Sequence, residues 1–243
     1  MAGAPAAKEH PGAGHRERLR ERFLDHGLAR FNDDEVLELL LTLATPRQDC
    51  KQRARQLLAT FGSLAKVLEA APAELAKIKG IGPKNVLGLK LPPAVARRYL
   101  EDRLINGQVL ADADQLADYL LFSMGPLPRE VFRVILVDRE RRVMDSEDLF
   151  FGTCDQAAVY PREVVARALA ADAAGLICAH NHPGGSPRPS RDDLAITRRL
   201  YFAARSVGLA FHDHLIVAGG EVRSMDQNGE LAGLAAEYEI LNL

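Results

Sequence analysis

The sequence of 243 residues is poor in cysteine, with one residue each at positions 50, 154 and 178. The number is odd, the spacing is wide and no CxxC pair occurs, which argues against a disulfide framework and against a cysteine-ligated zinc site. Cys178 ends a short apolar run, and we expect it to be a small buried thiol rather than a ligand.

Long apolar runs are absent as well. No continuous stretch approaches the roughly 20 residues that a membrane helix needs, and the N-terminal residues lack the apolar core of a signal peptide. We therefore expect a cytoplasmic protein without a membrane partner. Hydrophobic residues still make up 47% of the chain, which is enough to bury a core, and the length permits one large or two modest domains.

The patterning along the chain predicts a tail and two folded parts. Residues 1–14 are rich in Ala, Gly and Pro, and we expect a disordered tail. Residues 15–104 are helical in pattern throughout, with helices expected at 16–22, 33–43, 50–60 and from Ser63 onward. Residues 105–243 contain a helix at 112–122 and then strands that alternate with helices, which is typical of an α/β or mixed layered domain.

The segment Leu75–Lys84 predicts a tight hairpin between two helices. Gly80 and Gly82 flank an inward-facing Ile81, and backbone amides left free at the start of the second helix would bind phosphate. Three lysines add positive charge: Lys77, Lys79 and Lys84. Pro92 and Pro93 predict an interruption of the second helix.

Charge is divided unevenly between the two parts. Residues 16–103 hold 17 Lys and Arg against 12 Asp and Glu, a net charge of +5, whereas residues 104–243 hold 13 against 20, a net charge of −7. This asymmetry favours a contact of the helical part with nucleic acid, weak and independent of base sequence. The alternative is that the glycine-rich turn serves only packing or a protein contact.

The strongest chemical signal is a pair of histidines, His180 and His182, at the end of the apolar run 173–179. Side chains two apart share a face of a strand, so both imidazoles can point at one ion. Ser190 opens a helical pattern that brings Asp193 back beside them. Two neutral imidazoles and one carboxylate leave a tetrahedral zinc ion with an open position, as hydrolytic sites require. We expect one Zn²⁺ per chain.

A different interpretation of the same residues needs no metal. Ser190 and Asp193 also match the Ser-x-x-Asp capping box of a helix start, and the histidines could be polar residues at a strand end. A second pair, His212 and His214, precedes another strand-like run. It could be a rival metal pair, but no third ligand follows closely, so we favour Asp213 or His214 as a residue that orients the ligands.

The spacing His180-x-His182-x₇-Ser190-x₂-Asp193 resembles the JAMM signature of the JAB/MPN metalloprotease-like domains. His180-Asn-His-Pro183, with prolines at 187 and 189, resembles the bacterial RadC (UPF0758) branch. The resemblance covers most of the chain, roughly from Gly14 to the C-terminus. It implies an α/β fold with a mixed sheet flanked by helices, similar to cytidine deaminases, after an all-helical domain of the helix-hairpin-helix type.

The resemblance also implies roles for two further residues. Glu130, immediately before the strand-like run 131–137, would be the general base that takes a proton from the attacking water and passes it to the leaving nitrogen. Ser190 would donate a hydrogen bond to the oxyanion. Glu163 is a competing base, but it follows Pro161 in what we expect to be the first turn of a helix, where acids complement the helix dipole.

Three hypotheses of function follow. The preferred one is a zinc-dependent hydrolase of the JAB/MPN type, in which water at the metal attacks an amide of an unknown peptide or isopeptide, with Glu130 as general base. The second is a non-catalytic, DNA-associated protein, an accessory of DNA repair or processing, whose metal is structural. The third, a nuclease, is disfavoured because the site lacks the paired carboxylates of two-metal chemistry.

Overall fold

The structure is a computed structural model, and it describes residues 13–45, 48–105, 113–152 and 159–241. The chain divides into two compact units, Met1–Ala96 and Arg97–Leu243, each of which is described by itself. Helix α1 (Ala13–His26) begins two residues before the expected end of the tail, and residues 1–12 lie outside the described residues. No helix among the described residues is both long enough and apolar enough to cross a membrane.

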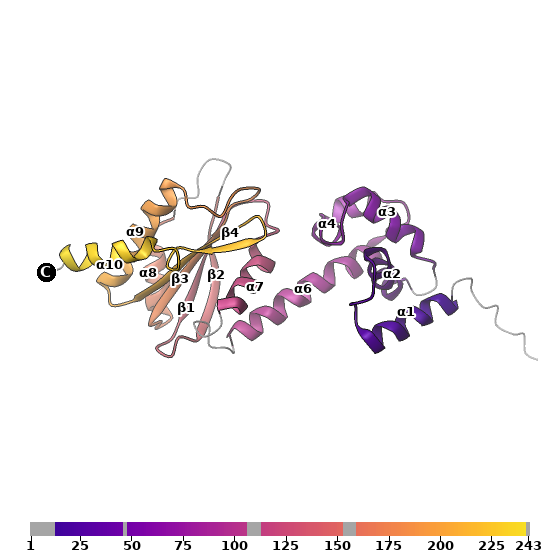
Figure 1. Cartoon of the computed structure of the whole chain (residues 1–243), viewed down its shortest axis with the longest axis horizontal. Helices are drawn as coiled ribbons and strands as arrows, with labels where there is room; N and C mark the ends of the chain where they lie inside the picture. Colours follow the sequence, from indigo (N-terminus) through magenta and orange to yellow (C-terminus); the bar gives the residue numbers. More distant parts are fainter. Residues whose placement is uncertain (1–12, 46–47, 106–112, 153–158, 242–243) are drawn as a thin grey trace, which may run out of the picture. The chain divides into compact units, whose positions relative to one another are not determined.

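The first unit is helical, as the patterning predicts (Figure 1). It contains α1, α2 (Asp33–Ala44), α3 (Lys51–Phe61), α4 (Leu64–Glu69), α5 (Pro72–Leu75) and the first part of α6 (Pro83–Ile105). Ser63 caps α4 by accepting a hydrogen bond from the backbone of Lys66. The apolar faces meet in one core, formed by Leu37, Leu41, Cys50, Ala54, Leu57, Val67, Leu75, Ile81 and Leu89.

The expected interruption of the helix at Pro92 and Pro93 is wrong, since α6 continues through both prolines to Ile105. A proline inside a helix removes a hydrogen bond and costs about 3 kcal/mol. Packing on either side of the prolines opposes this cost. Leu89 is fully buried in the core of the first unit, and Leu104 is buried in the second.

The second unit contains a five-stranded sheet in the order β2-β1-β3-β4-β5. Its strands are β1 (Val131–Val137), β2 (Val143–Phe151), β3 (Gly175–Asn181), β4 (Ala210–Ala218) and β5 (Glu221–Ser224). β3 and β4 are parallel, and the other neighbours are antiparallel. Helix α9 (Arg191–Ser206) connects the parallel pair, as a crossover must.

Helices cover both faces of this sheet (Figure 1). Helices α8 (Pro161–Ala170), α9 and α10 (Glu230–Leu241) pack on one face, and α7 (Ala113–Met124) with the last residues of α6 packs on the other. Every residue of β1 and β3 is buried, which explains why both runs are apolar almost throughout. The predicted mixed sheet flanked by helices, preceded by a helical region, is confirmed.

Candidate metal centre

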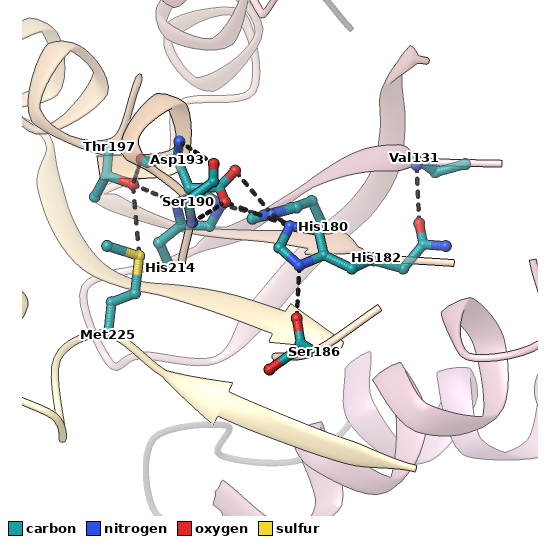
Figure 2. A network of polar contacts seen from close by, with 10 residues as sticks. Val131, His180, His182, Ser186, Ser190, Asp193, Thr197, His214 and Met225 are labelled. Carbon is teal, nitrogen blue, oxygen red and sulfur yellow. Dashed lines mark hydrogen bonds and ion pairs between the residues drawn. The ribbon is translucent and has the colours of Figure 1, made fainter. Parts of the chain in front are cut away.

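His180 and His182 lie at the end of β3 and immediately after it, and their imidazoles converge. The two Nε2 atoms are 2.8 Å apart, and both rings extend on the side of the sheet that α9 covers (Figure 2). His180 is fully buried, whereas about a fifth of the His182 side chain is exposed. The alternation of a strand therefore brings the two rings together as predicted, and solvent reaches the pair from the His182 side.

The start of α9 brings the carboxylate of Asp193 to the same point. Its Oδ1 lies 3.1 Å from Nε2 of His180, and its Oδ2 lies 3.3 Å from Nε2 of His182. The predicted capping box also forms, because Ser190 Oγ accepts from the Asp193 amide and the Ser190 amide donates to Asp193 Oδ2. Capping and ligation are therefore compatible here, since the cap orients the carboxylate that faces the histidines. The three side chains form a group that can hold a metal ion.

The hydrogen bonds around the rings determine which nitrogens carry lone pairs. Nδ1 of His182 lies 2.8 Å from the carbonyl oxygen of Ser186, which can only accept, so Nδ1 donates and Nε2 of the neutral ring has a lone pair. On the other ring, Nδ1 of His180 lies 2.8 Å from Nε2 of His214. When this Nδ1 donates, the Nε2 of His180 also presents a lone pair.

Two lone pairs and a carboxylate that face one another at 2.8 to 3.3 Å repel unless a metal ion or a proton lies among them. The donor set therefore fits a metal ion, and imidazole nitrogens with one carboxylate match zinc better than calcium or magnesium, which prefer oxygen ligands. The predicted set of ligands is brought together by the fold.

The same contacts shift two pKa values. Burial opposes ionisation of Asp193, but hydrogen bonds with His180 and His182 outweigh it, so the pKa of the carboxyl lies far below its ordinary value. The hydrogen bond with Asp193 raises the pKa of His182, with smaller contributions from Ser186 and from the charge of Glu130. In the absence of metal, the group therefore favours an ionised carboxylate beside a protonated imidazole.

Of the two residues expected to orient the ligands, only His214 contacts one. Successive residues of a strand face opposite sides of the sheet, so His214 meets His180, whereas Asp213 lies on the other side and bonds Ser224 Oγ and the Asp226 amide. The expectation for Asp213 is therefore wrong. His212 does not join the metal group either, because it lies beside Gly175 at the opposite end of β3.

Sequence reasoning missed Thr197, one turn after Asp193 in α9. Its Oγ lies 2.5 Å from Nδ1 of His214, 2.5 Å from the backbone oxygen of Asp193 and 3.6 Å from Sδ of Met225 (Figure 2). A threonine inside a helix is common, and the partner on β4 is far away in the sequence. The spacing i, i+4 from a ligand was the one available signal, and it is weak.

The two acids considered as general base occupy different surroundings. Glu130 is half-buried directly before β1, two residues before Phe132, which pairs with His180 across the sheet, so its backbone lies beside the end of β3 that carries the histidines. Glu163 is exposed in the first turn of α8 and pairs with the adjacent Arg162 at 3.8 Å, as expected of an acid that complements a helix dipole. The arrangement favours Glu130 of the two.

The hairpin of the first unit differs in one respect from its prediction. Ile81 packs in the core as expected, and Gly80 takes a φ of +84°, which the turn requires of a glycine. Two of the amides there are not free, however, because the Ile81 amide donates to the backbone oxygen of Ile78 and the Gly82 amide donates to Oδ1 of Asn85. The side chains of Lys77, Lys79 and Lys84 are exposed, and Lys77 pairs with Glu74.

Comparison with known proteins identifies the family. The family profile described as RadC-like JAB domain matches residues 110–230, and the profile described as UPF0758 N-terminal matches residues 13–87. A UPF0758 protein of Rhodobacter capsulatus is 45% identical over 213 residues, which cover 88% of this chain and 100% of the relative. A UPF0758 protein of Ruegeria pomeroyi is 43% identical over 217 residues, covering 89% and 97%.

The chain belongs to the UPF0758 (RadC) family. The family assignment confirms the resemblance drawn from the His-x-His and Ser-x-x-Asp spacing, and the RadC-like JAB match covers the whole metal group together with Glu130. The match to the UPF0758 N-terminal profile ends at residue 87, just after the hairpin of the helical unit.

Proposed function

We propose that this RadC-family chain is a zinc-dependent hydrolase of the JAB/MPN type, which cleaves an amide bond of a peptide or isopeptide substrate. The observation that carries the proposal is the convergence of two imidazole lone pairs and the Asp193 carboxylate, with Glu130 two residues before Phe132, the partner of His180 across the sheet. When bound, a zinc ion polarises a carbonyl oxygen and acidifies water. His180, His182 and Asp193 would hold it.

Two residues of the chain have roles in the proposed reaction. Glu130 accepts a proton from the water as the water oxygen attacks the carbonyl carbon, and returns that proton to the nitrogen as the C–N bond breaks, giving a carboxylic acid and an amine. Ser190 uses a lone pair for the helix cap. Its hydroxyl hydrogen can therefore point to the oxygen on which negative charge develops.

Metal analysis combined with a cleavage assay tests this proposal. We expect about one zinc per chain after removal of metals and reconstitution, and cleavage of members of a peptide library. Asp193→Ala should lose the zinc, whereas Glu130→Gln should keep it and abolish cleavage. Glu163→Gln is the matched control and should retain both properties, since Glu163 lies in the first turn of α8.

One result would count against the hydrolase, and another would count against its proposed base. A wild-type chain that binds no zinc would remove its basis, and a Glu130→Gln chain as active as wild type would exclude Glu130 as the base. Zinc that stabilises the wild-type protein without any cleavage would instead support the alternative, a non-catalytic DNA-associated protein with a structural metal.

A second candidate function concerns the helical unit, which would bind DNA through its phosphates. The exposed Lys79 and Lys84 near Gly80 support it, together with the net charge of +5 over residues 16–103. Since the neighbouring amides of Ile81 and Gly82 have internal partners, contact would depend on lysine charge. Each phosphate contact contributes about 0.9 to the slope of log affinity against log salt.

Substitution of Lys77, Lys79 and Lys84 together by Ala should weaken retention on DNA and flatten its salt dependence. Lys66→Ala is the control, because Lys66 is an exposed lysine of α4 in the same unit. Unchanged retention in the triple variant would exclude the hairpin as the contact.

A further inference from the structure

A closed chain of polar contacts ties the metal group to the interior of the second unit. It runs from the backbone oxygen of Asp193 to Thr197 Oγ, then to the ring of His214 and on to Nδ1 of His180, whose Nε2 faces the Asp193 carboxylate again (Figure 2). Three elements contribute to it: α9, β4 and β3. This series of contacts therefore begins and ends at Asp193.

The direction of each hydrogen bond in this chain follows from the chemistry of its members. The Thr197 hydroxyl has one hydrogen, and two of its three neighbours, the Asp193 carbonyl and the Met225 sulfur, can only accept. The carbonyl is the closer of these two, at 2.5 Å, so the hydrogen points there and Thr197 Oγ accepts from Nδ1 of His214.

The direction of this hydrogen bond determines the tautomers of both His214 and His180. With its hydrogen on Nδ1, the neutral ring of His214 has its lone pair on Nε2, which accepts from Nδ1 of His180. His180 then carries its hydrogen on Nδ1 and its lone pair on Nε2, the atom that faces Asp193 and His182. In the other tautomer of His180, an N–H group would occupy the position of a metal ligand.

The surroundings of Thr197 make a purely space-filling role a poor explanation. Thr197 and His214 have no exposed surface, and the His214 ring packs edge-on against Phe132. A buried hydroxyl and a buried imidazole cost free energy that valine and leucine would not. Valine has the same shape as threonine, so packing alone does not require the hydroxyl here.

We propose that Thr197 is a positioning residue for the metal centre, which acts through His214 to hold His180 in the tautomer that offers Nε2 to the metal. The inference rests on the proposed function in that it concerns the same metal site. Residues that orient a metal-bound histidine typically contribute 10- to 100-fold to metal affinity.

Three variants of the full chain test the inference. Thr197→Val keeps the shape and removes the hydroxyl, Thr197→Ser restores the hydroxyl, and Thr42→Val is the matched control. Thr42 is a buried helical threonine of the other unit, and its hydroxyl has no partner among the described residues. We would measure zinc affinity by competition with a chromogenic chelator, and the ring ¹⁵N shifts of labelled histidines in metal-free protein.

The expected results separate positioning from packing. Thr197→Val should weaken zinc binding by about 10- to 100-fold and give mixed tautomers at His214 and His180, whereas Thr197→Ser and Thr42→Val should match wild type in both measurements. If Thr197→Val does not fold, Thr197→Ala serves in its place, because it removes the hydroxyl and adds no atoms.

Two other outcomes are distinguishable. Wild-type affinity and tautomers in Thr197→Val would overturn the role of Thr197 and leave the hydrolase proposal intact. A wild-type chain that binds no zinc would overturn the hydrolase proposal, and the ¹⁵N shifts of metal-free protein would still decide whether Thr197 sets the tautomers.

Discussion

Asn181 Oδ1 accepts a hydrogen bond from the backbone N–H of Val131 at 2.8 Å, and so connects the strand of the metal ligands to the residue after Glu130. Its Nδ2 donates to the backbone oxygen of Arg129 at 3.0 Å. Asn181 lies between His180 and His182 in the sequence, and strand alternation directs its side chain to the opposite face. One amide therefore holds both backbone positions that flank Glu130.

Replacement of Asn181 by Leu should affect stability and catalysis without loss of metal. It leaves the Val131 N–H buried without its partner, which costs about 1–3 kcal/mol in the free energy of unfolding, measured by urea denaturation. Zinc content should stay near wild type, while cleavage by the proposed hydrolase should fall because Glu130 is no longer held. Asn228→Leu, at an exposed turn, is the control. Loss of zinc together with activity would contradict this account.

Much of the metal group was predictable because it depends on local rules. The period of two in a strand joins His180 to His182, and the capping box that places Asp193 spans only four residues. Hydrogen bonds within a few residues are encoded by spacing, so the fold had only to bring a strand end beside a helix start.

The remainder depends on contacts distant in the sequence. The register of β4 against β3 decides whether Asp213 or His214 faces the ligands. The role of Thr197 depends on its contact with His214, which lies on another element. The prolines of α6 show the converse case, in which a local rule predicts a break and packing overrides it. Two hairpin amides, those of Ile81 and Gly82, have internal partners, and the partner of Gly82 is Asn85, which the glycine pattern does not reveal.

Arg133 provides a test of how this unit tolerates a buried charge. Its guanidinium, 6% exposed, binds Asp148 through two hydrogen bonds of 2.5 and 3.1 Å and Ser123 through a third. Burial alone would lower the pKa of Arg133, but Asp148 outweighs it and raises that pKa, so the charge is retained. Asp148→Ala should therefore cost about 3–5 kcal/mol, because an uncompensated buried cation remains.

The companion variant separates charge from packing. Arg133→Met/Asp148→Ala should unfold at a higher urea concentration than Asp148→Ala alone, since methionine fills the space without a charge. Arg167→Ala breaks the more exposed ion pairs that this residue of α8 makes with Asp145 and Glu147 of β2, and it should shift the midpoint far less. A double variant less stable than Asp148→Ala would show that the arginine stem, and not its charge, matters.

Cys178 should be inert toward thiol reagents. It is fully buried in β3, and burial, with a smaller contribution from the charge of Asp213, raises the pKa of its thiol far above the ordinary value. The thiolate is the reactive form. In a Cys154→Ser chain, an aromatic disulfide reagent should label neither Cys178 nor the buried Cys50 until urea is added. Rapid labelling of the native protein would contradict the buried assignment.

Zinc affinity should fall with acidification sooner than for an ordinary histidine site. The hydrogen bond with Asp193 raises the pKa of His182 above 6.5, so metal-free protein holds a proton on this ring at a higher pH than a free histidine does. Zinc needs the unprotonated nitrogen. As the pH is lowered, the apparent zinc affinity should therefore begin to decline while the pH is still above 6.5. The decline should be about tenfold per pH unit for each competing proton.

The raised pKa of His182 also makes the stability of metal-free protein depend on pH, in the opposite direction to the zinc affinity. A raised pKa in the folded state means that protonated His182 stabilises the fold below the unfolded value, and that this contribution is lost as pH rises through the folded pKa. Metal-free protein should thus lose stability as pH rises through that range, while zinc-loaded protein gains it. The midpoints of urea denaturation, measured for the metal-free and the zinc-loaded protein across this pH range, test whether the two stabilities change in opposite directions. Parallel curves would show that His182 does not exchange a proton for the metal.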